Sequence, residues 1–264
     1  MKQRKIILSR KGFDSEYGGR PSPILPDGTM LSLPIPWNKE STSYDDLFHC
    51  GISYANIIRD LGGKLDTNMC HFDPDLRFET KDRSKDWRPC LGQSHIAASH
   101  LKSQGVEVGD IFLFFGRFRK TEYDSNGKLR YVKGAPDIHA IFGYLQIGEV
   151  ASTVEERAKF HWHPHTKEAN YINSMNYIFA SSDNLLSSDY SGAGVLRFND
   201  NLCLTKSGFS RSRWQLPECL ANVQMTYHNA NSKKKDYFQS AMIGQEFVFD
   251  SSEEIEKWIM KIVK

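Results

Sequence analysis

An imidazole and two carboxylates alternate along the segment His71-Phe72-Asp73-Pro74-Asp75. Because side chains of an extended chain alternate between two faces, His71, Asp73 and Asp75 would point to the same side. Such a set could bind a divalent metal ion, or it could divide the roles of general acid and general base. The structural alternative is an ordered loop in which the two aspartates cap backbone N–H groups. We favour function here and name His71 and Asp73 as candidate catalytic residues.

Three imidazoles fall within the five residues His161-Trp162-His163-Pro164-His165. Alternating histidines in an extended stretch can chelate zinc, iron or copper. A histidine-rich tract is only a compositional signal, and a zinc site needs a third or fourth ligand. His71 or Asp73 could supply that ligand, although the sequence does not place them beside the tract. We name His163 and His165 as candidate ligands of a divalent metal cofactor.

A third group of candidates follows the apolar run at residues 5–9. Adjacent glycines let backbone N–H groups approach an anion, and Arg and Lys side chains supply the opposite charge. We predict that the phosphate or nucleotide is bound by Arg10, Lys11, Gly18, Gly19, Arg20 and Ser22. Asp14, in the same segment, is a candidate catalytic residue. The pattern matches neither the Walker motif nor the dinucleotide fingerprint, and a solvated turn capped by Asp14 is the alternative.

His139 begins an apolar run that extends to Ile147. It shares a strand face with Ile141 and Gly143, so it is either a core histidine bonded to a backbone carbonyl or a base in a pocket. We retain it as the fourth catalytic candidate.

Basic residues concentrate only near the C-terminal end, at Arg211 and Arg213 beside Trp214 and in the triple lysine Lys233–Lys235. Arginine and tryptophan together could stack on a base and hold a phosphate. A run of lysines is more typical of a solvated loop.

The strands and helices that must position these residues can be predicted from the sequence, and together they indicate an α+β fold. Apolar and β-branched runs predict strands at 5–9, 110–119, 138–147 and 177–180, and helical spacing with stop signals predicts helices at 44–61, 93–104 and after Ser251. Residues 110–119 and 138–147 should pair around the Asn126-Gly127 turn, with glycines placed as in a bent barrel. We expect a mixed sheet or a partly closed β-barrel, with flanking helices and a long ordered N-terminal loop region.

Composition limits the class of protein. The chain has 264 residues, 39% hydrophobic and 25% charged, so it can bury a core, and a wholly disordered chain is excluded. Its formal net charge of +2 is too balanced to indicate nucleic-acid binding, so any phosphate-binding surface must be local. No repeat or long linker divides the sequence. We predict a single domain over residues 1–264, with a barrel-like core at about residues 90–205.

The cysteines and the N-terminus indicate the compartment. Five cysteines without C-x-x-C spacing argue against a disulfide framework and against a zinc ribbon. The apolar run Ile6–Leu8 is too short for a signal peptide, and no run approaches the roughly 20 apolar residues of a membrane-spanning helix. We expect a cytoplasmic protein with no membrane partner.

Taken in order, several of these segments resemble the nucleotide modification associated domain 3 family. The resemblance is carried by Ser9–Asp14 with Gly18-Gly19 and Pro21–Ile24, by His71–Leu76, by Ser99–Leu101 with Gly105-Val106 and Gly109–Gly116, by His139 with Gly143–Gln146, and by His163–His165 with Asn176–Ile178. This family comprises bacterial and phage proteins that are expected to act with DNA base-modification systems. The resemblance therefore implies DNA or a nucleotide as partner, in the company of other DNA-modification proteins.

The helix before Val108-Gly109-Asp110 and the strands that follow also look like the core of PUA-like and EVE-like barrels, which hold modified bases or RNA. The long N-terminal half departs from those small modules. Fold alone does not establish function, so this remains an analogy.

These observations lead to one hypothesis and two alternatives. The chain is interpreted as a DNA-base or nucleotide modification protein, a transferase or hydrolase acting on a base or its glycosidic bond. A non-catalytic reader of modified bases is the first alternative, and a metal-dependent nuclease or phosphohydrolase is the second. Signatures of methyltransferases, kinases and hydride-transfer enzymes are absent from the sequence.

Overall fold

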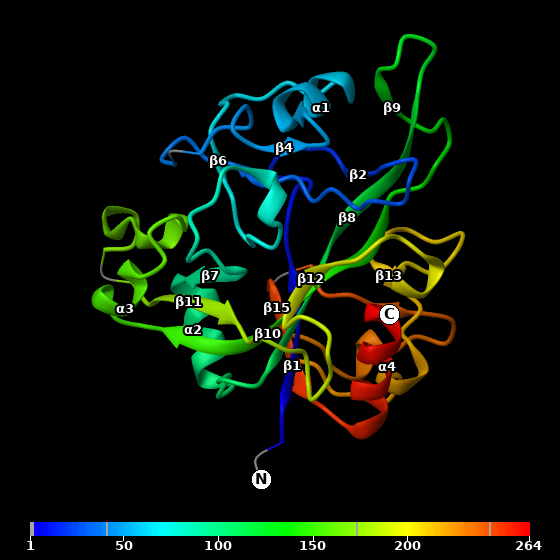
Figure 1. Cartoon of the computed structure of the whole chain (residues 1–264). Coiled ribbons are helices and arrows are strands. Elements are labelled where there is room, and N and C mark those ends of the chain that lie inside the picture. Colours follow the sequence, from blue (N-terminus) through cyan, green and yellow to red (C-terminus); the bar gives the residue numbers. More distant parts are fainter. Residues whose placement is uncertain (1–2, 41, 173, 243) are drawn as a thin grey trace.

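A mixed β-sheet forms the centre of the molecule (Figure 1). The computed structural model describes residues 3–40, 42–172, 174–242 and 244–264. Within these residues, nine strands belong to the sheet: β1 (Lys5–Arg10), β2 (Ser22–Ile24), β7 (Cys90–Ser94), β8 (Ile111–Tyr123), β9 (Leu129–Tyr131), β10 (Ile138–Ala151), β11 (Asn176–Ser181), β12 (Ala193–Val195) and β15 (Glu246–Asp250). The main path runs β15-β1-β8-β10-β11-β7, while β2 and β9 pair with β8 and β12 pairs with β10.

The centre of the sheet follows from the most apolar runs of the sequence. Ile6, Ile7 and Leu8 in β1 are fully buried, as are residues 111–115 of β8, so both faces of these strands are covered. β1 runs parallel to β8 and antiparallel to β15. β8 and β10 pair antiparallel as predicted, but the Asn126-Gly127 turn joins β8 to the short strand β9.

The sheet is open, and its two ends approach each other. β15 pairs only with β1 and β7 only with β11 within the described residues. Gln93 on β7 nevertheless donates a side-chain hydrogen bond to Glu246 on β15. The α+β fold with a mixed sheet is confirmed, and the sheet does not close into a barrel. It also includes β1, β2 and β15, which lie outside the range 90–205 predicted for the core.

In the part of the chain that the structure describes, four α-helices and several short elements surround the sheet. The helices are α1 (Tyr54–Asp60), α2 (His95–Ser103), α3 (Val154–Ala158) and α4 (Glu253–Val263). The remaining strands are β3 (Ile35–Pro36), β4 (Phe48–His49), β5 (Ile52–Ser53), β6 (Cys70–His71), β13 (Arg213–Trp214) and β14 (Phe238–Gln239). The 3₁₀ helices are η1 (Phe78–Thr80), η2 (Pro164–Thr166), η3 (Glu168–Asn170), η4 (Asp200–Leu202), η5 (Glu218–Leu220) and η6 (Ala230–Ser232).

The helix predicted at 44–61 was too long, because local turn chemistry interrupts it. β4 and β5 form a hairpin around Cys50 and Gly51, whose φ angles are 47° and 78°. Ser53 then caps α1 by accepting a hydrogen bond from the Asn56 N–H. The C-terminal helix is capped by Ser252, one residue after the predicted position.

Among the residues that the structure describes, three apolar clusters stabilise this arrangement. The largest includes residues from β1, β8, β10, β15 and α4, so both ends of the chain share one core. A second joins the N-terminal region to α1 through Phe13, Tyr44 and Leu47, which accounts for the ordered N-terminal loop region. The third contains Cys90 and Phe160, close to the histidine tract.

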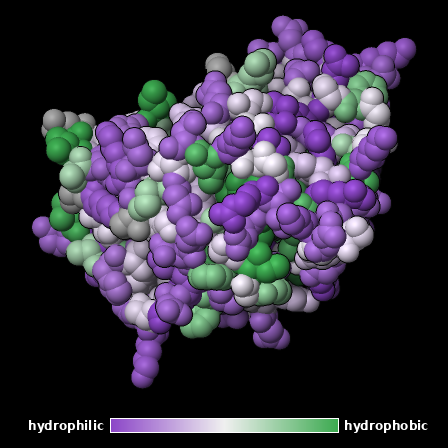
Figure 2. Space-filling model, turned by 90° about the horizontal axis from the view of Figure 1, so that it is seen from above, coloured by the Kyte–Doolittle hydropathy of each residue, from purple (hydrophilic) through white to green (hydrophobic). Residues whose placement is uncertain are grey.

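The outer surface is mainly hydrophilic on the face shown in Figure 2, where apolar side chains form small separate patches. Among the described residues, no helix has both the length and the apolar character needed to cross a membrane.

Candidate metal centre

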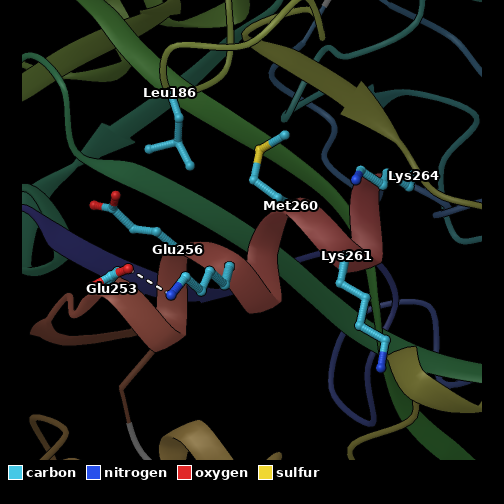
Figure 3. Close-up of a pocket in the computed structure, with 7 residues that line it drawn as sticks. Leu186, Glu253, Glu256, Met260, Lys261 and Lys264 are labelled. Carbon is cyan, nitrogen blue, oxygen red and sulfur yellow. Dashed lines mark ion pairs between the residues drawn. The ribbon is translucent and has the colours of Figure 1, made fainter.

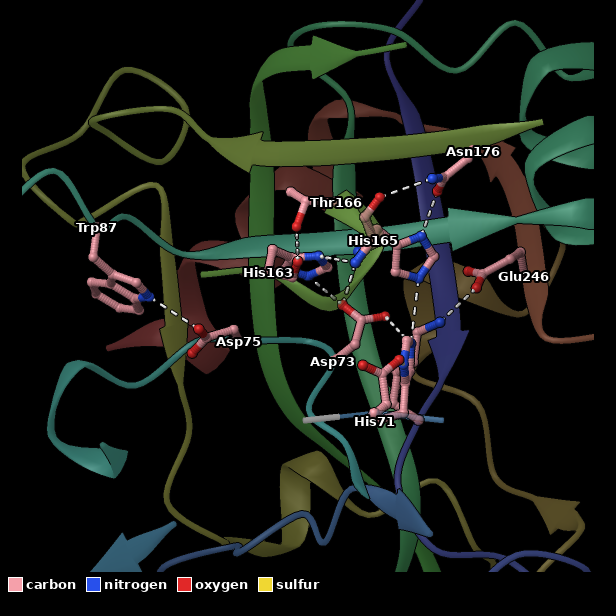
Figure 4. A network of polar contacts seen from close by, with 12 residues as sticks. His71, Asp73, Asp75, Trp87, His163, His165, Thr166, Asn176 and Glu246 are labelled. Atoms are coloured by element: carbon pink, nitrogen blue, oxygen red, sulfur yellow. Dashed lines mark hydrogen bonds and ion pairs between the residues drawn. The ribbon is translucent and has the colours of Figure 1, made fainter. Parts of the chain in front are cut away.

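Two segments that are distant in the sequence bring His71, Asp73, His163 and His165 together (Figure 4). β6, which ends at His71, is held by antiparallel pairing with β3. His163 and His165 are fixed by η2, where the His163 Nδ1 accepts a hydrogen bond from the backbone N–H of His165 at 3.2 Å. The sequence predicted each segment as functional, and the tertiary structure makes them neighbours.

The potential ligand atoms of His71, Asp73 and His165 all lie within 4.8 Å of one another. The His165 Nε2 is 3.3 Å from the His71 Nε2, which is 3.9 Å from the Asp73 Oδ2. The Asp73 side chain is only 4% exposed and His71 17%, so solvent reaches this group mainly past His71. Two imidazoles and one carboxylate facing one another are a donor set for a divalent transition metal.

Hydrogen bonds fix the protonation of His165. The Asn176 Nδ2 donates to the His165 carbonyl at 2.9 Å, so the Asn176 Oδ1 is the atom that faces the His165 Nδ1 at 2.6 Å. An amide oxygen only accepts, so the Nδ1 carries the proton and the Nε2 presents a lone pair toward His71. The Tyr171 ring stacks on the imidazole at 4.5 Å. Burial holds the pKa of His165 well below its ordinary value, which keeps the ring neutral.

His71 is oriented in the same way. Its Nδ1 donates to the Glu40 Oε1 at 2.9 Å, and Lys167 contacts the other oxygen of Glu40 at 3.1 Å. Burial favours a higher pKa for Glu40, but the hydrogen bond and charge of His71 outweigh it and the pKa is lowered. With its Nδ1 turned to Glu40, the ring directs its Nε2 inward, toward His165. A histidine whose outer nitrogen donates to a carboxylate or carbonyl is the usual arrangement around a protein-bound metal.

His163 supports Asp73 and uses both of its ring nitrogens within the protein. Because its Nδ1 accepts a backbone N–H, its Nε2 carries the proton and donates to the Asp73 Oδ1 at 3.1 Å. The Gly92 N–H donates to the same oxygen at 2.8 Å. Burial would raise the pKa of Asp73, yet the hydrogen bond that His163 donates helps to lower it below its ordinary value. Asp73 is thus held ionised, with Oδ2 directed toward His71.

The two remaining polar residues of these motifs lie outside the centre. Asp75 points away from it (Figure 4) and forms ion pairs with Arg83, with both oxygen contacts at 2.6 Å, so the expected common face with Asp73 does not form. His161 is exposed and lies 3.5 Å from Asp86. The alternation rule fails for Asp75 because its backbone is bonded to Cys90 instead of continuing β6.

A second buried polar cluster adjoins the centre. The Glu246 Oε1 accepts hydrogen bonds from Ser9 at 3.1 Å and Lys11 at 3.2 Å, and a further one from Gln93. The Lys11 charge also contributes to lowering the pKa of Asp73. Of the predicted phosphate-binding residues, Lys11 is therefore the one that lies beside the candidate metal centre.

The other predicted phosphate-binding residues are dispersed and have partners within the protein. Arg10 donates to the carbonyls of Ala241 and Met242, and burial lowers its pKa. Arg20 donates to the Leu61 carbonyl at 2.8 Å, and the Ser22 hydroxyl accepts from the Leu33 N–H at 3.0 Å.

Asp14 and the glycine pair build a turn. The Asp14 carboxylate accepts the N–H groups of Glu16 and Tyr17, both at 2.8 Å. Gly18 and Gly19 have φ angles of 78° and 66°, and a Cβ on Gly18 would overlap the Phe13 ring. Roles of these residues in phosphate binding and catalysis stay predictions, whereas their part in the turn is visible.

His139 lies in a separate buried site. The Trp214 Nε1 donates to its Nδ1 at 3.1 Å, and the Phe115 ring packs at 5.5 Å. Burial, together with the charges of Arg10 and Arg211, lowers the pKa of His139 to about 3. Its catalytic role stays a prediction, and the structure does not bring it to His71.

The lowered pKa of His139 predicts that acid reduces the folding stability of the protein. Between about pH 6.5 and pH 3, the unfolded chain protonates His139 while the folded chain does not, so the folding stability should fall as the pH falls. The contribution of His139 to the slope should be about 1.4 kcal/mol per pH unit between pH 6 and 4. Urea unfolding of the wild type and of His139→Asn across this range measures it. Equal slopes in the two proteins would contradict the prediction.

Hollows on the surface of the described residues include two that lie away from the metal centre. One, of about 420 Å³, runs along α4 beside Leu186 and Met260 (Figure 3). The other, of about 860 Å³, is lined by Phe48, Phe78 and charged residues of the 79–83 segment. Neither is lined by the four residues brought together at the centre, so the case for a site rests on the donor geometry.

Sequence reasoning missed three residues that shape the centre. Glu40 and Asn176 orient the two imidazoles, and Gly92 binds Asp73. A Cβ on Gly92 would lie 2.2 Å from the His165 ring, so the close approach requires glycine. No local spacing marks these residues, because each lies in a different segment from the side chain that it contacts.

The comparisons with known proteins identify a family and nothing narrower. A family model described as nucleotide modification associated domain 3 matches residues 5–250. No curated protein and no solved structure matches the chain. The matched span includes every residue of the candidate metal centre.

Proposed function

The chain belongs to the nucleotide modification associated domain 3 family, and from this premise we propose that it is a metal-dependent hydrolase whose substrate is a nucleotide unit. The family assignment supplies the association with nucleotide modification. The observation that carries the metal-dependent chemistry is the convergence of His71, Asp73 and His165, with the two imidazole Nε2 atoms 3.3 Å apart beside an ionised carboxylate.

This arrangement favours a cation on electrostatic grounds. The Asp73 carboxylate is ionised and almost completely buried, and the two Nε2 atoms lie beside it, so a cation held by all three groups would balance the buried negative charge. Three protein ligands leave coordination positions open, which is typical of catalytic rather than structural zinc sites. A divalent ion held there would supply a Lewis acid and lower the pKa of a bound water.

The surrounding residues have distinct parts in this proposal. Glu40 and Asn176 hold the imidazoles, while His163 and Gly92 hold the Asp73 carboxylate. Lys11, which is ion-paired with Glu246, is the cation to which we assign the stabilisation of negative charge on a substrate phosphate. Since His71 is the most exposed of the three ligands, we expect the substrate to approach over its ring.

Product analysis tests this proposal. Purified protein loaded separately with Zn²⁺, Mn²⁺ or Fe²⁺ is incubated with DNA and with free deoxynucleotides, and released bases, phosphate and altered nucleosides are measured by mass spectrometry. We expect a product that requires the metal and disappears in Asp73→Asn. His161→Gln, in the same tract but outside the centre, is the matched control. A non-catalytic reader of modified bases would bind without forming any product, and this outcome would overturn the proposed hydrolase.

A further inference from the structure

Six basic side chains from two distant segments form one surface, which we call the basic surface. It consists of Lys206, Arg211, Arg213, Lys233, Lys234 and Lys235, and two of these cations, Lys206 and Arg213, lie over the rings of Phe209 and Tyr237. The pairing of β13 with β14 brings the two segments together, because Arg213 lies opposite Gln239. The Lys234 N–H donates to the Tyr237 carbonyl at 2.9 Å, which closes the turn that carries the three lysines.

The two aromatic rings support the cations without neutralising them. The ring centroids of Phe209 and Tyr237 lie 5.6 Å apart. The Arg213 guanidinium is 5.1 Å from the Tyr237 centroid, and the Lys206 Nζ is 5.0 Å from the Phe209 centroid. A cation over a ring face is attracted by the π-system and keeps N–H donors for another acceptor. The basic surface is thus partly ordered before any ligand binds.

The charge of the basic surface is not compensated by ion pairs. None of its six cations forms an ion pair with a carboxylate in the described part of the chain, whereas cations elsewhere, such as Lys5 and Arg117, do. The contacts that three of them make are to neutral groups: the Asp236 carbonyl, the Asn222 amide oxygen and the Ser15 hydroxyl. Residues 205–240 contain six basic and two acidic residues, although the whole chain has a net charge of only +2.

We propose that the basic surface binds the phosphate backbone of a single nucleic-acid strand. Clustered, unpaired lysines and arginines bind a polyanion because each phosphate contact releases a condensed counterion. The arginine and the aromatic rings suit a flexible strand, whose bases are open to stacking. Arg211 connects the basic surface to the loop that begins at Lys11, through its hydrogen bond of 2.6 Å to Ser15. For the reaction itself, this inference rests on the proposed function. It adds that the substrate is a nucleotide within a strand.

Fluorescence anisotropy with a fluorescein-labelled single-stranded DNA oligonucleotide tests this surface. The triple variant Lys233→Gln, Lys234→Gln, Lys235→Gln should lower the affinity at least about tenfold at low salt. It should also reduce the slope of log affinity against log salt by about 2, since each contact with a single strand contributes about 0.7. The matched control is Lys257→Gln, Lys261→Gln, Lys264→Gln on α4, which removes the same charge elsewhere.

The outcomes distinguish binding at the basic surface from nonspecific binding through the total charge of the protein. Loss of affinity in the basic-surface variant alone supports the proposal. Equal losses in both triple variants, or no loss in either, would overturn it. Arg213→Ala, which removes the cation over Tyr237, should weaken binding in the same direction and provides a second, single-site test.

The same proteins distinguish this inference from the proposed function. The basic-surface variant should bind Zn²⁺ as the wild type does, and His165→Gln should still bind the oligonucleotide in the presence of a chelator. Oligonucleotide binding by a protein that binds no metal would overturn the hydrolase alone. Metal-dependent hydrolysis of free nucleotides, without strand binding at the basic surface, would overturn the inference alone.

Discussion

Zinc affinity should fall by at least about 100-fold when His71 or His165 is replaced by glutamine, because even residues behind a metal ligand contribute about 10- to 100-fold. Each substitution removes one Nε2 donor from the set of three ligands found among the described residues. Isothermal titration of the metal-stripped protein with Zn²⁺ measures the change, and elemental analysis of the purified protein gives the stoichiometry.

Two features of the chain make this experiment decisive. His161→Gln alters the same histidine tract at an exposed position and should leave the zinc affinity unchanged. His71 is partly exposed, so its variant should remain folded even if loss of the buried His165 disturbs packing. Wild-type affinity in His71→Gln, with the fold verified by circular dichroism, would remove His71 from the metal centre.

Loss of Arg83 should destabilise the protein by about 3–5 kcal/mol, because it leaves the buried carboxylate of Asp75 without its partner. The two side chains are only 1% and 2% exposed, and Arg83 binds both oxygens of Asp75. Burial raises the pKa of Asp75, and the charge of Arg83 counteracts that rise. Trp87 donates one further hydrogen bond at 3.0 Å, which cannot replace the cation.

Urea denaturation of Arg83→Met measures this loss. Arg130→Met is the matched control, since its ion pair with Glu122 is largely exposed and such pairs contribute at most about 1 kcal/mol. A change in Arg83→Met no larger than in the control would show that Asp75 is solvated or neutral in the folded state.

Much of the fold could be predicted from local patterns. The apolar run that forms β1 and the long pair β8 and β10 are determined by burial on both faces, which only continuous hydrophobic runs can satisfy. The helix at 44–61 was predicted poorly, because Cys50 and Gly51 adopt positive φ angles and turn the chain before Ser53. Helical spacing of apolar residues does not reveal such a turn.

The family also follows from the sequence, since the ordered motifs that suggested it lie within the matched residues 5–250. The candidate site could be predicted from the sequence only in part. Each motif on its own indicated chemistry, and four of the named residues meet in space, whereas Asp14 and His139 lie in other environments. Spacing along the chain carries no information about which loop ends face each other.

The sequence by itself determined the residue types available for chemistry, the buried strands and the family of this protein, because these depend on composition and short-range order. Only the tertiary structure decided that His71 and Asp73 face His165, that His163 serves Asp73, and that two basic segments form one surface. The physical reason is that such contacts join residues about 90 positions apart or belong to strands paired across a turn. They form only when the whole sheet folds and fixes the directions of its loops.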